Sequence, residues 1–66
     1  MAILKVIEVM ADSNTSWEDA TKNAVAHASN SVNHIKSAFV QSQSVVVKDG
    51  GITGFRVNVK ITFEVK

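Results

Sequence analysis

Apolar and polar residues alternate most regularly near the C-terminal end of the chain. Between Ile52 and Val65, every second residue is apolar from Phe55 onward, and the residues between them are mostly polar. The apolar set is Phe55, Val57, Val59, Ile61, Phe63 and Val65. A period of two places the two sets on opposite faces of a β-strand, so Ile52–Val65 is predicted to be a strand with one apolar face.

Two earlier segments also have the composition of β-strands. Ile3–Met10 is apolar and β-branched except for two charged residues, which predicts a strand buried on much of both faces, and a polar loop over 11–16 follows. Ile35–Val47 ends in three consecutive valines, and Lys48–Gly51 is a strong turn signal. The last two strands are therefore predicted to form a long antiparallel hairpin.

The segment between the first two strands has the pattern of a helix. Small or apolar residues recur at steps of three and four and form a narrow stripe, made of Trp17, Ala20, Ala24, Ala28, Val32 and Ile35. We expect the helix to run from about Trp17 to Val32. Thr15 with Glu18, or Ser16 with Asp19, fits a capping box at its start.

The length of the chain points to self-association. With 66 residues it holds one domain, 1–66, in the order β-α-β-β. A core this small and without disulfides is marginal, and oligomerisation is a common remedy. A strand of about twelve residues spans roughly 40 Å, whereas a compact globule of this length is about 28 Å across. We expect the hairpin to overhang its own core and to be covered by neighbouring copies.

Composition excludes several classes of protein. The net charge of +1 argues against nucleic acid as a partner and against a polybasic membrane-surface protein. The chain has no cysteine, which excludes disulfides and thiolate metal sites. The apolar N-terminal segment carries charges and is too short to span a bilayer. We therefore expect a cytoplasmic protein with no membrane partner.

Side chains capable of catalysis are not arranged in a recognisable motif. Without a cysteine nucleophile or a supported Ser-His-Asp arrangement, we expect a binding protein and no enzyme. His27 and His34 are seven residues apart and could share a helix face, but they supply only half a metal site, so we interpret them as solvated or interface residues. Gly50, Gly51 and Gly54 lack the order of a phosphate loop and indicate a hairpin turn with a bulge at Gly54.

Two features near the predicted helix start are candidates for ligand sites. Asp12, Asn14 and Ser16 have the spacing of the first ligands of an EF-hand, but Trp17 replaces the required glycine and Asn23 the required glutamate. That motif fails, which leaves open a looser oxygen site at a subunit contact. We interpret Trp17 as a packing anchor against the sheet or a neighbour, rather than a ligand-stacking platform.

The polar face of the last strand is either solvated or lines the cavity of a hollow oligomer.

The order and spacing of these motifs resemble the dodecin family over almost the whole chain. The residues that carry the resemblance are Lys5-Val6-Ile7-Glu8, Thr15-Ser16-Trp17-Glu18-Asp19-Ala20, Ala24-Val25, Ser31-Val32 and the alternation from Phe55-Arg56-Val57 to Phe63. The resemblance implies a three-stranded antiparallel sheet wrapped around one helix, within a hollow homododecamer. It also implies storage of riboflavin or related flavins, stacked in pairs between aromatic side chains at subunit contacts. Some members bind coenzyme A.

This sequence departs from the family pattern at the flavin position. The stacking tryptophan of the family falls at Ser37, and its flavin-contacting glutamine falls at Arg56. Serine offers no stacking surface, whereas arginine can hold an anion or stack on a ring. The pattern is closer to a non-flavin branch called calcium dodecin, although no metal ligand can be carried over. We expect a homododecameric small-ligand binding or storage protein with Ser37 and Arg56 at its ligand site. The alternative is a calcium-linked or purely structural shell.

Overall fold

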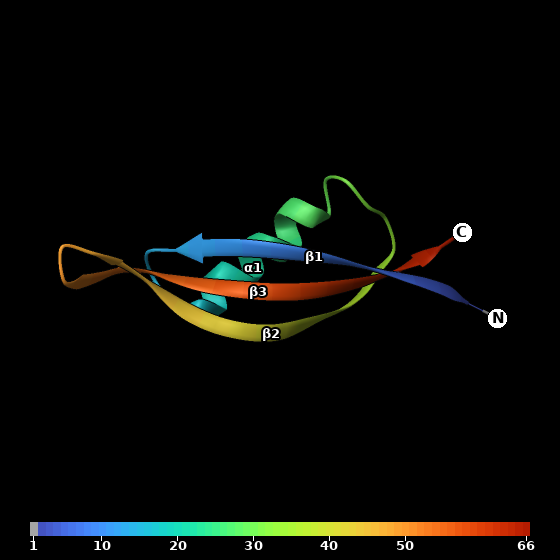
Figure 1. The fold of residues 1–66 in the computed structure, drawn as a ribbon. Coiled ribbons are helices and arrows are strands. Elements are labelled where there is room, and N and C mark those ends of the chain that lie inside the picture. Colours follow the sequence, from blue (N-terminus) through green and yellow to red (C-terminus); the bar gives the residue numbers. More distant parts are fainter. Residues whose placement is uncertain (1) are drawn as a thin grey trace.

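The computed structural model describes residues 2–66 as three long strands and one helix (Figure 1). In chain order these are β1 (Ile3–Ser13), α1 (Trp17–Ala28), β2 (Ile35–Lys48) and β3 (Gly51–Val65). β3 lies between β1 and β2 and pairs antiparallel with both. The α+β class, with a three-stranded antiparallel sheet and one helix, is confirmed.

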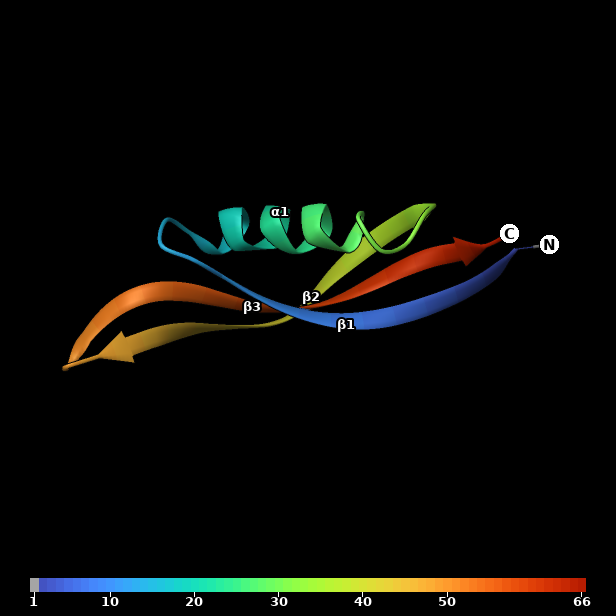
Figure 2. The same cartoon turned by 90° about the horizontal axis from the view of Figure 1, so that it is seen from above.

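The core lies between α1 and one face of the sheet, as Figure 2 shows from above. Its buried residues are Ala20, Ala24 and Ala28 of the helix and Val57, Val59 and Ile61 of β3. Because alanine side chains are small, the helix can lie close to the sheet, and the branched side chains of β3 fill the space between them. The predicted alanine stripe and the predicted apolar face of the last strand therefore pack against each other.

β1 is longer than the sequence pattern predicted. It continues beyond Met10 to Ser13, and its last three residues pair with Val57, Arg56 and Phe55 of β3. The expected loop over residues 11–16 was wrong for residues 11–13. Polar side chains suggested a loop there, but the ladder with β3 satisfies the backbone groups of this segment.

The helix is shorter than predicted, ending at Ala28 instead of near Val32. After Ala28 the backbone changes to tighter hydrogen bonds, with the N–H of Asn30 bonded to the carbonyl of His27. The Ser29 hydroxyl also donates to the Val25 carbonyl at 2.9 Å, the same bond that Thr21 makes to Trp17 within the helix.

The structure also selects one of the two predicted caps at the helix start. The backbone N–H of Asp19 donates to the Ser16 side chain at 3.0 Å, which makes Ser16 the N-cap residue. Beside it, Trp17 anchors the first turn on the sheet. Its indole Nε1 donates to the Ser44 carbonyl at 2.9 Å, and its ring meets Phe55 edge-on with centroids 5.1 Å apart. The interpretation of Trp17 as a packing anchor is confirmed.

The hairpin between β2 and β3 turns at Asp49 and Gly50. Both have positive φ, at 52° and 79°, which matches the two-residue turn that suits the twist of paired strands. The pairing shifts between Val46 and Val47, opposite the segment that contains Gly54. The predicted turn is therefore confirmed, whereas the irregularity falls at Thr53, one residue before the predicted position, because Gly54 itself pairs with Val46.

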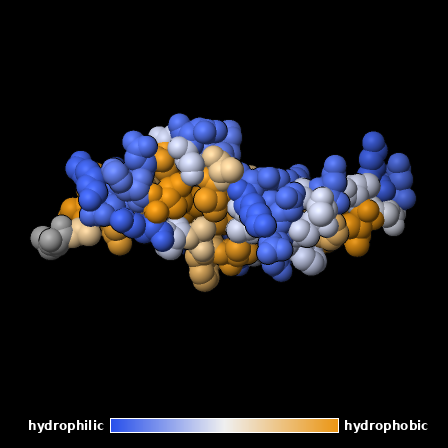
Figure 3. Space-filling view, turned by 180° about the vertical axis from the view of Figure 1, so that it is seen from behind, coloured by the Kyte–Doolittle hydropathy of each residue, from blue (hydrophilic) through white to orange (hydrophobic). Residues whose placement is uncertain are grey.

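The molecule is strongly elongated. It measures 50 × 19 × 14 Å, and its radius of gyration is 13.4 Å. A compact chain of this length would have a radius of about 11 Å. The hairpin end projects beyond α1, and apolar atoms remain visible there in Figure 3. The predicted overhang is thus present in a single copy. The helix in residues 2–66 is too short and too polar to cross a membrane.

Candidate functional site

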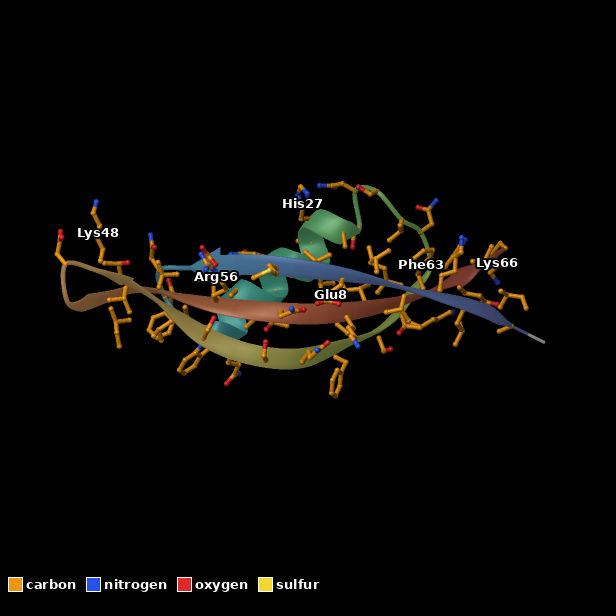
Figure 4. The ribbon with its side chains drawn as sticks, in the orientation of Figure 1. Glu8, His27, Lys48, Arg56, Phe63 and Lys66 are labelled. Atoms are coloured by element: carbon orange, nitrogen blue, oxygen red, sulfur yellow. The ribbon has the colours of Figure 1, made fainter. Side chains whose placement is uncertain are left out.

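The candidate ligand surface is the face of the sheet turned away from α1, here called the outer face. Since Val57, Val59 and Ile61 point toward the helix, the intervening residues of β3 and their cross-strand partners share the opposite face. The outer face comprises Leu4, Val6, Glu8, Met10 and Asp12 of β1, Arg56, Asn58, Lys60, Thr62 and Glu64 of β3, and Ser37, Phe39, Ser42 and Ser44 of β2. Figure 4 labels two of these residues, Glu8 and Arg56, on the sheet.

Arg56 is held by Asp12, its direct partner on β1. The Arg56 Nε donates to Asp12 Oδ1 at 2.6 Å, and Nη2 donates to Oδ2 at 3.0 Å, a two-pronged ion pair. The side-chain hydrogen bond from Arg56 holds the pKa of Asp12 below its usual value, and the same bond raises the pKa of Arg56. Both groups stay charged at neutral pH, so the guanidinium predicted to contact ligand is already engaged.

Ser37 lies far from Arg56 within one copy. Its partner on β3 is Thr62, six residues beyond Arg56, which corresponds to about 20 Å along the strand. The two residues are therefore too far apart within one copy for a ligand the size of a single ring system to touch both. Ser37 carries no ring, and paired flavin stacking does not fit this position.

An exposed ring does lie near Ser37 on the outer face. Phe39, two residues further along β2, is 65% exposed and is paired with Lys60. The family resemblance predicted Ser37 as a ligand-site residue and did not predict Phe39. The alternation of faces along a strand was the available signal, since residues two apart share a face.

Apolar side chains flank the charged centre of the outer face. Leu4, Val6 and Met10 of β1 are 53%, 57% and 62% exposed, comparable to Phe39. Between Met10 and Ser42, the Oδ1 atom of Asn58 is buried and accepts no hydrogen bond from the described residues. Burial without a partner is unfavourable for an amide oxygen. The outer face therefore combines exposed apolar surface with an unmet hydrogen-bond acceptor.

A second feature is an open pocket of about 360 Å³ between the end of β1 and the start of α1. It is lined by Asp12, Ser13, Asn14, Thr15, Asp19 and Asn23. The buried Ser13 hydroxyl donates to Asp19 Oδ2 at 2.6 Å and accepts from the Thr15 N–H at 2.9 Å. Asn23 Nδ2 donates to the same Asp19 oxygen at 3.4 Å. All the side chains lining the pocket offer oxygen atoms.

The pocket differs from the calcium loop that the sequence suggested. Asp12 and Asn14 line it, but Ser16 is used as the helix cap, and Asp19 joins from the helix instead. Asp19 and Asn23 lie one helical turn apart, a spacing visible in the sequence but overlooked. Within residues 2–66, no three His, Asp or Glu side chains are grouped to hold a metal ion.

The two histidines do not share a helix face. Since α1 ends at Ala28, His34 lies in the following loop, where its φ is 63°, while His27 is on the last turn of the helix (Figure 4). Both side chains are exposed. The shared face that the spacing allowed does not form because the helix stops earlier than its stripe suggested, and the exposure of both residues agrees with their interpretation as solvated or interface residues.

Comparisons with known proteins agree with this fold. The family model described as Dodecin matches residues 3–66. Calcium dodecin of Mycobacterium tuberculosis is 35% identical over 66 residues, covering 100% of this chain and 93% of that protein. Its crystal structure, described as a calcium-chelating antigen with a novel calcium-binding site, matches with a TM-score of 0.85, covering 97% of this chain and 91% of that one.

Dodecins of other bacteria match in fold. The Streptomyces coelicolor dodecin gives a TM-score of 0.92 at 25% identity, covering 98% of this chain and 93% of that one. A point mutant of Thermus thermophilus dodecin gives a TM-score of 0.92 at 20% identity, covering 100% of this chain and 98% of that one. The family model, the 35% identical relative and the shared architecture agree over nearly every residue, and the chain belongs to the dodecin family.

Proposed function

We propose that this chain is the subunit of a closed homo-oligomeric shell, a dodecamer, that binds and stores a small molecule without turning it over. The observation that carries this proposal is the apolar surface left uncovered in one copy. Leu4, Val6, Met10 and Phe39 are each more than half exposed on one face of the sheet. Surface of this kind marks an interaction site or an aggregation liability.

The energy available from covering that face is large for so small a chain. Full burial of a Leu, Val, Met or Phe side chain is worth about 1.5–3 kcal/mol, so covering four half-exposed side chains provides about 3–6 kcal/mol per copy. Domains of this size have a total stability of only a few kcal/mol. A neighbouring copy could also supply the donor that Asn58 Oδ1 lacks.

The ligand site of the proposed shell lies on the outer face, with Ser37 and Arg56 contributed by different copies. Their separation within one chain supports a site that assembly completes. The missing ring at Ser37 argues against tight paired flavin stacking. We therefore propose a ligand held between subunits, with Phe39 as the exposed ring nearest to Ser37.

Native mass spectrometry of protein purified from its own host tests the proposal most directly, because it reports subunit number and retained ligand together. We expect a dodecamer that carries a small molecule. Thermal denaturation with added riboflavin, coenzyme A or a nucleotide then identifies the ligand class, because a ligand bound to the folded state raises Tm. A well-folded monomer at micromolar concentration would contradict the proposal.

A second candidate is a calcium-linked assembly. It is supported by the 35% identical relative whose name includes calcium and by the oxygen-lined pocket beside α1. Calcium takes six to eight oxygen ligands, and Asp19, Asn14, Asn23 and Thr15 offer the right atom type. The oxygen donors suit calcium. Because Asp12 is engaged by Arg56, water molecules or residues of a second copy must complete the coordination of the ion.

Chelation separates the two candidates. For the calcium-linked assembly, we expect EGTA to lower the Tm of the oligomer and calcium to restore it, while Asp19→Asn removes the response. Glu18→Gln, which removes a carboxylate that does not line the pocket, serves as the charge control and should leave the calcium response unchanged. An oligomer whose Tm ignores both EGTA and calcium contradicts this candidate.

A further inference from the structure

The ion pair on the outer face occupies the Nε–Nη2 edge of the Arg56 guanidinium with a carboxylate from the same chain. Two guanidinium donors of Arg56 bond to the two oxygens of Asp12, at 2.6 and 3.0 Å. This fork geometry is the one by which arginine recognises carboxylate and phosphate groups. Asp12 thus takes the place that the charged group of an anionic ligand would need.

The other charged residues of this face also lie opposite or beside residues of the other sign. Along β3, Lys60 follows Arg56 by four residues, at a spacing of about 13 Å, and each faces an acid on β1. The partners are Asp12 for Arg56 and Glu8 for Lys60. Glu64, further along β3, lies 3.4 Å from Lys36 Nζ and 3.6 Å from Lys66 Nζ. Among the strand residues that define the outer face, the two positive charges are Arg56 and Lys60. The three negative charges are Glu8, Asp12 and Glu64, so these residues give the face no excess of positive charge to attract an anion.

The two cross-strand pairs, Asp12–Arg56 and Glu8–Lys60, differ in whether their side chains form an ion pair. Asp12 and Arg56 are in direct contact, whereas none of the ion pairs between described residues joins Lys60 to Glu8. Because the neighbouring strand holds Asp12 at a high effective concentration, an external anion must displace it to bind at the Nε–Nη2 edge of Arg56. Displacement would also leave the Asp12 carboxylate next to the incoming negative charge, which is repulsive.

We infer that Asp12 is a specificity-determining residue, whose carboxylate occupies Arg56 and keeps phosphorylated or other anionic ligands off the outer face. The face then selects uncharged ligands, which can use the exposed apolar side chains beside the ion pair. This inference deepens the proposed ligand-binding function and rests on it. It assigns Arg56 to an internal partner instead of to a ligand phosphate.

Asp12→Asn tests the inference, with inorganic pyrophosphate as the probe and isothermal titration calorimetry as the measurement. The substitution keeps the shape of the side chain but removes the charge that engages Arg56. We expect pyrophosphate to bind the variant about fivefold more tightly than the wild type at low salt, the upper range for breaking an exposed ion pair. In the double variant Asp12→Asn/Arg56→Gln, the gain should disappear.

Glu8→Gln is the matched control, since it removes one negative charge from the same strand and face without freeing Arg56. If it tightens pyrophosphate binding as much as Asp12→Asn does, the effect comes from net charge and the inference is wrong. Equal binding by Asp12→Asn and wild type also overturns it. Light scattering on the same samples reports the oligomeric state, so a failure of the proposed shell is seen separately from a failure of this inference.

Discussion

The Cα of Gly54 lies so close to the end of β1 that a Cβ placed on it would be 3.3 Å from the backbone oxygen of Ser13. The same Cβ would be 3.6 Å from the side chain of Val46. Gly54 is buried, and it marks the point where the sheet narrows from three strands to the two-stranded hairpin end. The close approach of β1 therefore depends on the missing side chain at this position.

Gly54→Ala is expected to destabilise the chain by about 1 kcal/mol, because the contacted oxygen belongs to the backbone of a paired strand and cannot move freely. The difference in unfolding free energy between this variant and the wild type is measured by urea denaturation, monitored by far-UV circular dichroism. Gly51→Ala is the control: its Cβ would meet only the Lys48 carbonyl, at 3.8 Å, and we expect a change of less than about 0.5 kcal/mol. Equal losses from both variants would refute the steric explanation.

Trp17→Phe is expected to cost about 1–2 kcal/mol. The substitution keeps an aromatic ring near Phe55 but removes the indole N–H that donates to the Ser44 carbonyl. Because Trp17 is the single tryptophan, unfolding must be followed by circular dichroism instead of fluorescence. Trp17→Ala removes the ring as well and should cost clearly more. Unchanged stability in both variants would show that the anchor contributes nothing.

Ala24→Leu should destabilise the chain by about 1–3 kcal/mol, since the residue is 1% exposed and packed in the core against β3. Ala26→Leu is the matched control on the exposed side of the same helix, and it should change stability by less than about 0.5 kcal/mol. Thermal denaturation of both variants is sufficient. The opposite order of the two effects would contradict the assigned helix orientation.

Regular repetition made most of the fold predictable from the sequence. The two-residue alternation after Phe55 and the alanine stripe after Trp17 each predict an element, and the structure packs the two patterns against each other. Element ends were less predictable because they depend on local hydrogen bonds. Beyond Ala28 the N–H of Asn30 bonds to the His27 carbonyl, and no periodicity reports that change of hydrogen bonding.

The candidate site was harder to predict, since cross-strand register decides which residues meet. Asp12 and Arg56 are 44 positions apart, and their pairing depends on β1 continuing beyond Met10. Sequence reasoning ended the strand before Asp12 and could not find this partner. Phe39 was missed for a related reason, because its exposure depends on which face of β2 the helix leaves uncovered.

The Asp12–Arg56 pair predicts how stability depends on acid. The folded-state pKa of Asp12 lies below the unfolded value of about 3.9, so the pair stabilises the folded chain above that pH. As pH falls through the folded pKa, Asp12 is protonated and the contribution is lost. We expect the difference in urea midpoint between wild type and Asp12→Asn to be present at pH 7, to shrink below about pH 4 and to fall with added salt. A difference in urea midpoint that stays the same at every pH would contradict this role of the ion pair.

Phe39→Ser is expected to weaken assembly without unfolding the single chain. The ring is 65% exposed in one copy, so its loss removes little internal packing. Covering that exposed surface in an assembly is worth about 1–2 kcal/mol per copy, which corresponds to about a tenfold weaker contact for each site lost. Light scattering over a dilution series should show Phe39→Ser dissociating at higher concentration than wild type. Phe39→Leu keeps an apolar side chain and should assemble nearly as well. If Phe39→Ser assembles like the wild type at every concentration, the outer face near Phe39 is not a contact between copies.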